Sequence, residues 1–152
     1  MHAEEQFEMK AKSKHFLVVE DNQDDAYLLM RAFRSMPLCT AYVARSLGEA
    51  RAYLSAAGIY QDRLNFPFPD GIVLGLPALP DLVFVEWLGH TFHNLPVFAL
   101  AAGAPAETID HLHRLGVKEV IERPASIDAV RELLQRLAQD ICADPSVKPH
   151  IL

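Results

Sequence analysis

The sequence predicts a single α/β domain in which a parallel sheet is covered by helices on both faces. Five short apolar runs alternate with five segments that carry helix signals, and this alternation is typical of parallel strands joined by crossover helices. The chain has 152 residues, of which 51% are hydrophobic and 22% are charged, so one domain with a buried core is expected. The expected divisions are a flexible arm at residues 1–14, the domain at residues 15–142 and a tail at residues 143–152.

The five apolar runs are the expected strands. Each is too short for a helix of the usual length and is flanked by glycine, proline or charged residues, which favours strands buried on both faces. The first run is rich in β-branched residues and stops at the acids Glu20 and Asp21. The expected strands are residues 15–20, 39–43, 71–76, 96–101 and 117–121.

The segments between these runs carry start and stop signals for helices. Asn22, Ser46 and Ser126 each precede apolar residues at helical spacing and are expected N-caps, and Ser46 begins a Ser-x-x-Glu capping box. Pro105 suits a first helical turn, and Gly116 suits a helix end. The expected helices run from Asn22 to before Pro37 and then span residues 46–57, 81–92, 105–115 and 126–142, with a loop at residues 59–69.

Composition excludes several classes of function. The net charge of −6 argues against nucleic-acid binding, because a negative chain repels a phosphate backbone. The two cysteines, Cys39 and Cys142, are far apart and lack the spacing of a zinc site or a disulfide scaffold, which fits a reducing compartment. No apolar run is long enough for a membrane span or a signal peptide. We therefore expect a soluble, cytoplasmic protein that binds neither nucleic acid nor membrane.

In a parallel sheet, ligands bind outside the carboxyl ends of the strands. The candidate site residues are those that directly follow an expected strand or end it. They are Glu20, Asp21, Gly75, Ala101 and Arg123, with Pro124 next to Arg123.

Four motifs stand in order along the chain. They are Leu17-Val-Val-Glu-Asp-Asn22 with Asp24-Asp25, then Pro69-Asp70-x4-Gly75, then Leu95-Pro-Val-Phe-Ala-Leu-Ala101, and finally Leu115-Gly-Val with Ile121-Glu-Arg-Pro124. Over roughly residues 15–142 the chain resembles the receiver domain of response regulators, a mainly bacterial family of two-component phosphorelay signalling. The resemblance implies a doubly wound, flavodoxin-like sheet with strand order 2-1-3-4-5.

The resemblance also implies what each site residue should do, and here the chain departs from the family. In receivers an acidic pair holds Mg²⁺, an aspartate accepts the phosphoryl group, and a Thr or Ser and a Lys bind its oxygens. Glu20 and Asp21 match the acidic pair, but the phosphoacceptor position is Gly75, the Thr/Ser position is Ala101 and the Lys position is Arg123. We expect weak or absent Mg²⁺ binding, no other cofactor, and Arg123 paired with the two acids.

The function that follows is that of a stand-alone pseudo-receiver, which is not an enzyme and works by binding a histidine kinase, another regulator or a second copy of itself as a homodimer. Leu115, Val120 and Arg131 are the expected partner-binding residues, by resemblance. Trp87 is either core or an interface anchor.

Two alternatives stay open. The former phosphorylation pocket, widened at Gly75 and Ala101, could hold a small anion or metabolite on Arg123. An unconventional acid, Asp81, could accept phosphate, although its position at the start of a helix favours a role as N-cap.

Overall fold

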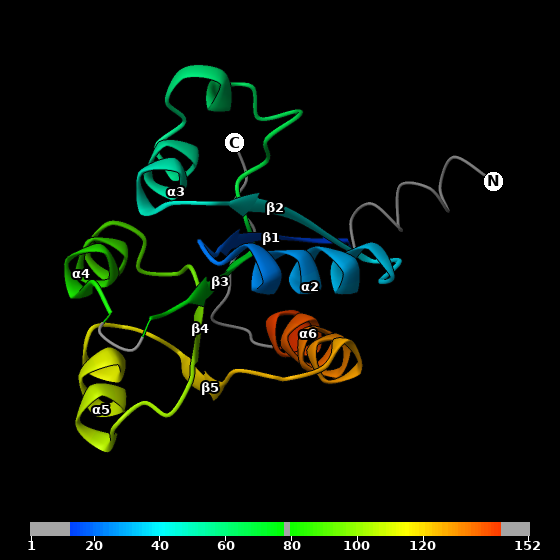
Figure 1. Cartoon of the computed structure of the whole chain (residues 1–152). Helices are drawn as coiled ribbons and strands as arrows, with labels where there is room; N and C mark the ends of the chain where they lie inside the picture. Colours follow the sequence, from blue (N-terminus) through cyan, green and yellow to red (C-terminus); the bar gives the residue numbers. More distant parts are fainter. Residues whose placement is uncertain (1–12, 78–79, 144–152) are drawn as a thin grey trace.

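The computed structural model describes residues 13–77 and 80–143, and the side chains of residues 142 and 143 are not part of that description. Five parallel strands form one sheet in the order β2-β1-β3-β4-β5, as expected (Figure 1). The strands are β1 (Lys14–Val19), β2 (Cys39–Ala44), β3 (Gly71–Gly75), β4 (Val97–Ala101) and β5 (Glu119–Glu122). The helices are α2 (Gln23–Arg34), α3 (Leu47–Leu54), η1 (Gly58–Gln61), α4 (Leu82–Thr91), α5 (Ala106–Arg114) and α6 (Ile127–Ala143).

Most of the predicted arm (1–14) and tail (143–152) lies outside the described residues. Within the described residues, the expected end of α3 and the expected start of β5 were wrong. Helix α3 ends at Leu54, because Ala56 adopts a left-handed backbone (φ 56°), and the predicted loop contains η1. Strand β5 starts at Glu119, because Val117 still donates its backbone N–H to Leu112 at the end of α5.

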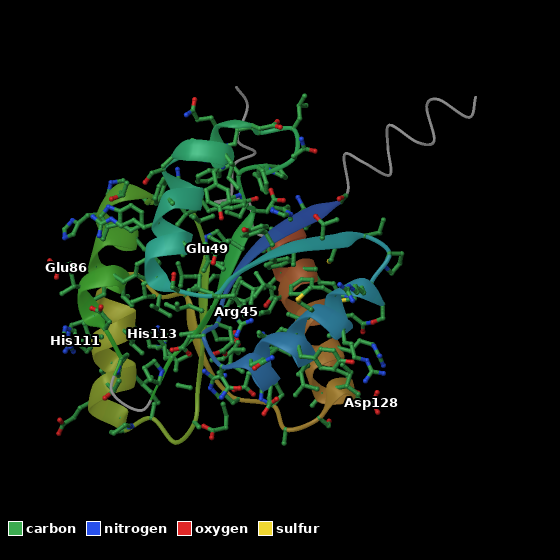
Figure 2. All side chains as sticks on the ribbon, turned by 45° about the horizontal axis from the view of Figure 1, so that its top comes forward. Arg45, Glu49, Glu86, His111, His113 and Asp128 are labelled. Carbon is green, nitrogen blue, oxygen red and sulfur yellow. The ribbon has the colours of Figure 1, made fainter. Side chains whose placement is uncertain are left out.

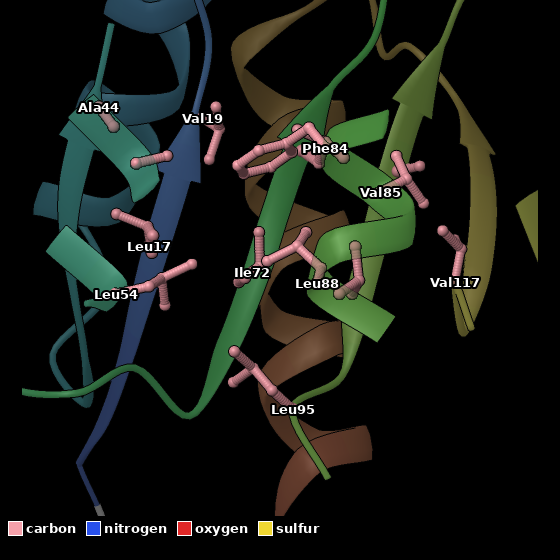
Figure 3. Close-up of a cluster of buried hydrophobic side chains, with 14 of the residues drawn as sticks. Leu17, Val19, Ala44, Leu54, Ile72, Phe84, Val85, Leu88, Leu95 and Val117 are labelled. Carbon is pink, nitrogen blue, oxygen red and sulfur yellow. The ribbon is translucent and has the colours of Figure 1, made fainter. Parts of the chain in front are cut away.

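Helices cover both faces of the sheet, as the alternating pattern predicts. Helices α2 and α6 lie on one face, and α3, α4 and α5 lie on the other (Figure 1). Neighbouring residues of β1 point to opposite faces, so that Phe16 and Val18 pack against α2 and α6, whereas Leu17 and Val19 face α3 and α4 (Figure 3). Among the described residues, no helix is both long and apolar enough to cross a membrane.

Trp87 belongs to the α4 side of the larger core rather than standing out as an anchor. Its ring is partly buried, meets Phe92 edge-on at 5.6 Å between centroids, and lies 4.4 Å from the guanidinium carbon of Arg51 on α3. The cation–π contact ties α3 to α4.

His15 links β1 to a cluster of aromatic side chains beside β2. Its Nε2 lies 2.8 Å from the Tyr53 hydroxyl, and its Nδ1 lies 2.9 Å from Thr40 Oγ1. Burial lowers the pKa of His15 below its usual value of 6.5, and the nearby carboxylate of Asp70 only partly opposes this effect. The native state therefore favours the neutral ring.

We expect acid to destabilise the protein through His15. The folded-state pKa lies below the unfolded one, so the stabilising contribution is full above the unfolded value of about 6.5 and is lost as the pH falls through the folded value. Urea unfolding at about pH 7 and about pH 5 should show this loss in the wild type, and a smaller one in His15→Gln. The exposed His93→Gln is the control, and an equal loss in His15→Gln would contradict the assignment.

Candidate functional site

The carboxyl ends of β1, β3 and β5 bring Glu20, Gly75 and Arg123 together. Arg123 Nη1 donates to Glu20 Oε1 at 2.7 Å and to Asp25 Oδ2 at 3.2 Å, and Nη2 donates to the carbonyl oxygen of Leu76 at 3.2 Å. The Glu20 side chain is only 1% exposed and that of Arg123 is 21% exposed. A buried carboxylate thus has a guanidinium directly against it, which is the arrangement that its desolvation requires.

A side chain at position 75 would require the Glu20 carboxylate to move. A Cβ atom on Gly75 would overlap Glu20 Oε1 and would lie 2.7 Å from Glu20 Cδ and 3.0 Å from Arg123 Nη2. The Glu20 carboxylate therefore fills the volume that a side chain at position 75 would need. Its second oxygen, Oε2, accepts from the backbone N–H of Asn22 at 3.2 Å, so both oxygens have partners.

The predicted salt bridge between Arg123 and the acidic pair is confirmed for Glu20 and wrong for Asp21. The second carboxylate on Arg123 is that of Asp25, in the first turn of α2. Asp21 is exposed and lines a neighbouring cavity instead, while its carbonyl oxygen accepts from Arg45 Nη2 at 3.3 Å. The sequence placed Asp25 in the motif after the first strand but gave it no partner, so its contact with Arg123 was missed.

Ala101 ends β4 and is buried, with no hydroxyl to offer a ligand. The loop that follows it is held by Glu122, whose two carboxylate oxygens lie 3.0 Å and 3.2 Å from the backbone nitrogen of Gly103 that donates to them. Gly103 has a φ of +61°, a conformation that favours glycine. The sequence gave no role to Glu122, although it directly precedes Arg123, so its contact with Gly103 was missed.

A divalent cation does not fit these residues. The Glu20 carboxylate is committed to Arg123 and the Asn22 amide, Gly75 offers no oxygen ligand from a side chain, and Asp21 faces another space. Within residues 13–77 and 80–141, no three His, Cys, Asp or Glu side chains form a group that could hold a metal ion. Magnesium needs several oxygen ligands that are free to approach it.

No family model and no curated protein matches the chain at a significant level. Solved structures do. The phosphorylated cyanobacterial phytochrome response regulator RcpA is 24% identical, with a TM-score of 0.72 over 86% of this chain and 95% of that one. A response regulator in red light signaling of R. palustris is 22% identical, with a TM-score of 0.77 over 90% and 99%. The Mn²⁺-bound response regulator Rcp1 is 19% identical, with a TM-score of 0.70 over 90% and 99%.

The chain has the receiver fold. At these identities the likeness establishes the fold, and the fold places Glu20, Gly75 and Arg123 at the edge of the sheet where ligands bind. Pro124 follows Arg123 and lines a small cavity with Leu29, Leu100 and Val130.

A cavity of about 210 Å³ opens beside Gly75, on the α3 and α4 side of the receiver sheet. Its walls are mainly apolar, with Leu47, Leu76 and Phe84 among them, and Asp21 and Arg45 supply charge. Arg123 does not line it, and Glu20 fills the place that a side chain at position 75 would need. The expectation of a widened pocket around Arg123 was therefore wrong, because the guanidinium is already bound by two carboxylates.

Asp81 also lines this cavity and is an N-cap, as sequence favours. Its Oδ1 accepts from the backbone N–H of Val83 at 3.0 Å, at the start of α4. Asp81→Ala is expected to lower the free energy of unfolding by about 1 kcal/mol, and Asp81→Asn by much less, because asparagine caps equally well. Urea unfolding of the three proteins checks this. Equal losses in both variants would show that the carboxylate does more than cap the helix.

Of the expected partner-binding residues, Val120 lies on the edge strand β5, Leu115 follows α5 and Arg131 lies on α6. Leu115 and Val120 pack at the margin of the core on the α5 side. Arg131 lies on α6, which covers the opposite face, and its Nε donates to Ser35 Oγ at 2.9 Å. The resemblance grouped them on one face of the domain. Helices α5 and α6 flank the edge strand β5 on opposite sides of the sheet, so the proposed partner face stays a prediction.

The histidines of α4 and α5 lie away from the site. Figure 2 shows His111 and His113 on α5, apart from Arg45. His113 Nδ1 lies 3.0 Å from the carbonyl oxygen of Val117, and His90 pairs with Glu86 at 3.7 Å on the exposed side of α4. These contacts are local to each helix and give no metal-binding geometry.

Proposed function

We propose that this chain is a receiver-like module of two-component signalling that binds a protein partner and does not accept phosphate. The observation that carries the proposal is the Glu20 carboxylate, which lies against Arg123 and fills the space of a side chain at position 75. The receiver fold of the chain supports the signalling class, since the structures it resembles include response regulators.

Phosphoryl transfer needs a nucleophile, a hydrogen-bond donor for the phosphoryl oxygens and a cation to neutralise them. Position 75 has no nucleophilic oxygen, and Ala101 supplies no hydroxyl. The positive charge of Arg123 is already neutralised by Glu20 and Asp25. With this chemistry absent, binding is the activity that the fold still supports, and we propose that the domain is not an enzyme.

The proposed partner is a protein of the same signalling class: a histidine kinase, another regulator or a second copy of this chain. We propose a cytoplasmic location on the basis of these proposed partners. The negative charge of the chain supports a protein partner over a nucleic acid.

The test is the intact mass of the protein after incubation with acetyl phosphate and Mg²⁺. The wild type is expected to keep its mass. A variant with the receiver residues restored, Glu20→Asp/Gly75→Asp/Ala101→Thr/Arg123→Lys, is expected to gain one phosphoryl group, because the shorter aspartate at position 20 leaves room at position 75. Co-purification of the wild type with a histidine kinase or a response regulator, without any phosphodonor, would then support the binding role.

Phosphate on the wild type would contradict the proposal, and peptide mapping would identify the acid that carries it. Asp21 and Asp81, the acids that line the cavity, are the candidates for such a role.

The cavity beside Gly75 favours one second candidate, a sensor of a small anion or metabolite carboxylate. The anion would bind to Arg45 rather than to Arg123, because Arg45 lines the cavity. The backbone N–H of Arg45 donates to the carboxylate of Glu49, which lies beside it (Figure 2). Phosphate or sulfate should then raise the melting temperature of the wild type but not of Arg45→Ala. Equal shifts in both proteins would remove this candidate.

A further inference from the structure

A single guanidinium joins three separate segments at the carboxyl edge of the sheet. Arg123 follows β5, and its acceptors are Glu20 after β1, Asp25 in α2 and the Leu76 carbonyl after β3. These segments are far apart in the sequence, with 103 positions between Arg123 and Glu20 and 47 between Arg123 and Leu76. The cation that holds them together belongs to the chain itself.

We infer that Arg123 is a permanent internal cation that takes the place of a divalent metal at this edge and keeps the site closed to Mg²⁺. The inference deepens the proposed function and rests on the same site. It adds that the arrangement of these loops is independent of the magnesium concentration, and that removing Arg123 uncovers a divalent-cation site built on Glu20 and Asp25.

Competition between the two cations follows from the geometry. Mg²⁺ gives up its bound water reluctantly and needs near-octahedral oxygen ligands at about 2.1 Å. To reach Glu20 it would have to displace a guanidinium that contacts the carboxylate at 2.7 Å and two other acceptors at 3.2 Å. Because Arg123 is part of the chain, its local concentration is fixed and does not depend on solution conditions.

Removal of the guanidinium leaves the carboxylates of Glu20 and Asp25 without their shared cation. Glu20, with only 1% of its side chain exposed, would lose its counter-ion, and the carboxylate of Asp25 lies nearby. Carboxylate oxygens in this state are the ligands that hard divalent cations accept. The carboxylate of Asp21, on the adjoining loop, adds further negative potential.

A charged side chain of the chain itself also holds Gly103, after β4. The Glu122 carboxylate accepts the Gly103 N–H, where a bound anion or a moving side chain would otherwise compete for this amide. Glu20 after β1, Leu76 after β3, Gly103 after β4 and Arg123 after β5 are thus all held by contacts within the chain. This supports a site with one arrangement rather than a site that waits for a ligand.

The experiment is a Mg²⁺ titration, by calorimetry and by thermal unfolding, of the wild type, Arg123→Gln and Glu20→Gln/Arg123→Gln, with NaCl at matched ionic strength as the control. The wild type is expected to show no saturable heat and no saturable shift in melting temperature. Arg123→Gln is expected to gain saturable binding and a rise of several degrees. The double variant should lose that gain, because it lacks the buried carboxylate.

Two results would overturn the inference: saturable Mg²⁺ binding by the wild type, or no gain in Arg123→Gln. If Arg123→Gln folds only when Mg²⁺ is present, the inference is supported. If that variant stays unfolded in Mg²⁺ while the double variant folds, the inference is wrong. None of these results depends on phosphoryl transfer, so a wild type that gains phosphate would contradict the proposed function separately.

Discussion

Replacing Arg123 with methionine is expected to lower the free energy of unfolding by about 3–5 kcal/mol, among the largest losses that any single substitution outside the core would cause. The reason is the carboxylate left behind. Glu20 is 1% exposed, and among the described residues the donor that remains to it without Arg123 is the backbone N–H of Asn22 at 3.2 Å. The carbonyl of Leu76 and the carboxylate of Asp25 also lose a donor, although Asp25 can turn to water because its side chain is 40% exposed.

The matched control removes both charges. Glu20→Met/Arg123→Met should recover most of the loss, because a buried ion pair replaced by apolar residues of similar size is often neutral or stabilising. Urea unfolding of the two single variants and the double variant gives the coupling free energy between the two residues. Additive losses in the double variant would mean that the salt bridge is not the reason for the cost. The reverse single substitution, Glu20→Met, should cost less, because Arg123 is 21% exposed and keeps Asp25.

The fold could be predicted from the sequence because the strand signals and the helix signals agree on the same order of elements. Apolar runs with no polar alternation mark strands that are buried on both faces. Capping residues such as Asn22 and Ser46 mark helix starts, and the structure has both caps. The misplaced boundaries lie where local signals conflict. Gly58 looked like the end of α3, but the left-handed residue nearest the helix end is Ala56, a residue type that seldom adopts that backbone.

The site was predicted less completely, because its contacts join residues far apart in the sequence. The pairing of Glu20 with Arg123 could be inferred since a buried acid needs a cation. Asp25 and Glu122 could not be assigned in this way. Both have an ordinary local explanation, as a first-turn charge of α2 and as an exposed residue at the end of a strand, and only the packed sheet brings them to Arg123 and Gly103.

The surroundings of Gly75 also depend on residues far away in the sequence. By resemblance to receivers, the sequence predicted that glycine at this position removes a nucleophile and enlarges the pocket. In the structure the space is occupied, since the longer side chain of Glu20 reaches into it and meets Arg123 there. The residues at positions 20, 75 and 123 are therefore one unit, and a change at one of them has to be matched by a change at another.

The second large effect follows from this unit: Gly75→Asp alone is expected to destabilise the protein by about 3 kcal/mol and to leave it unphosphorylated. The new Cβ would overlap Glu20 Oε1, and overpacking of this kind costs about 1–3 kcal/mol. The new carboxylate would add a like charge beside a buried one, which raises the cost further. Urea unfolding measures the loss, and intact mass after acetyl phosphate treatment reports on phosphorylation.

Gly75→Asp should lower the free energy of unfolding of the wild type but raise that of a variant in which Glu20 is shortened. In Glu20→Ala the space is vacated and Arg123 loses its closest partner, so an aspartate at position 75 can enter the gap and pair with the guanidinium. Glu20→Ala/Gly75→Asp should then be more stable than Glu20→Ala, although Gly75→Asp is less stable than the wild type. This reversal distinguishes steric exclusion by Glu20 from a general intolerance of side chains at position 75, since a general intolerance would make aspartate unfavourable in both backgrounds.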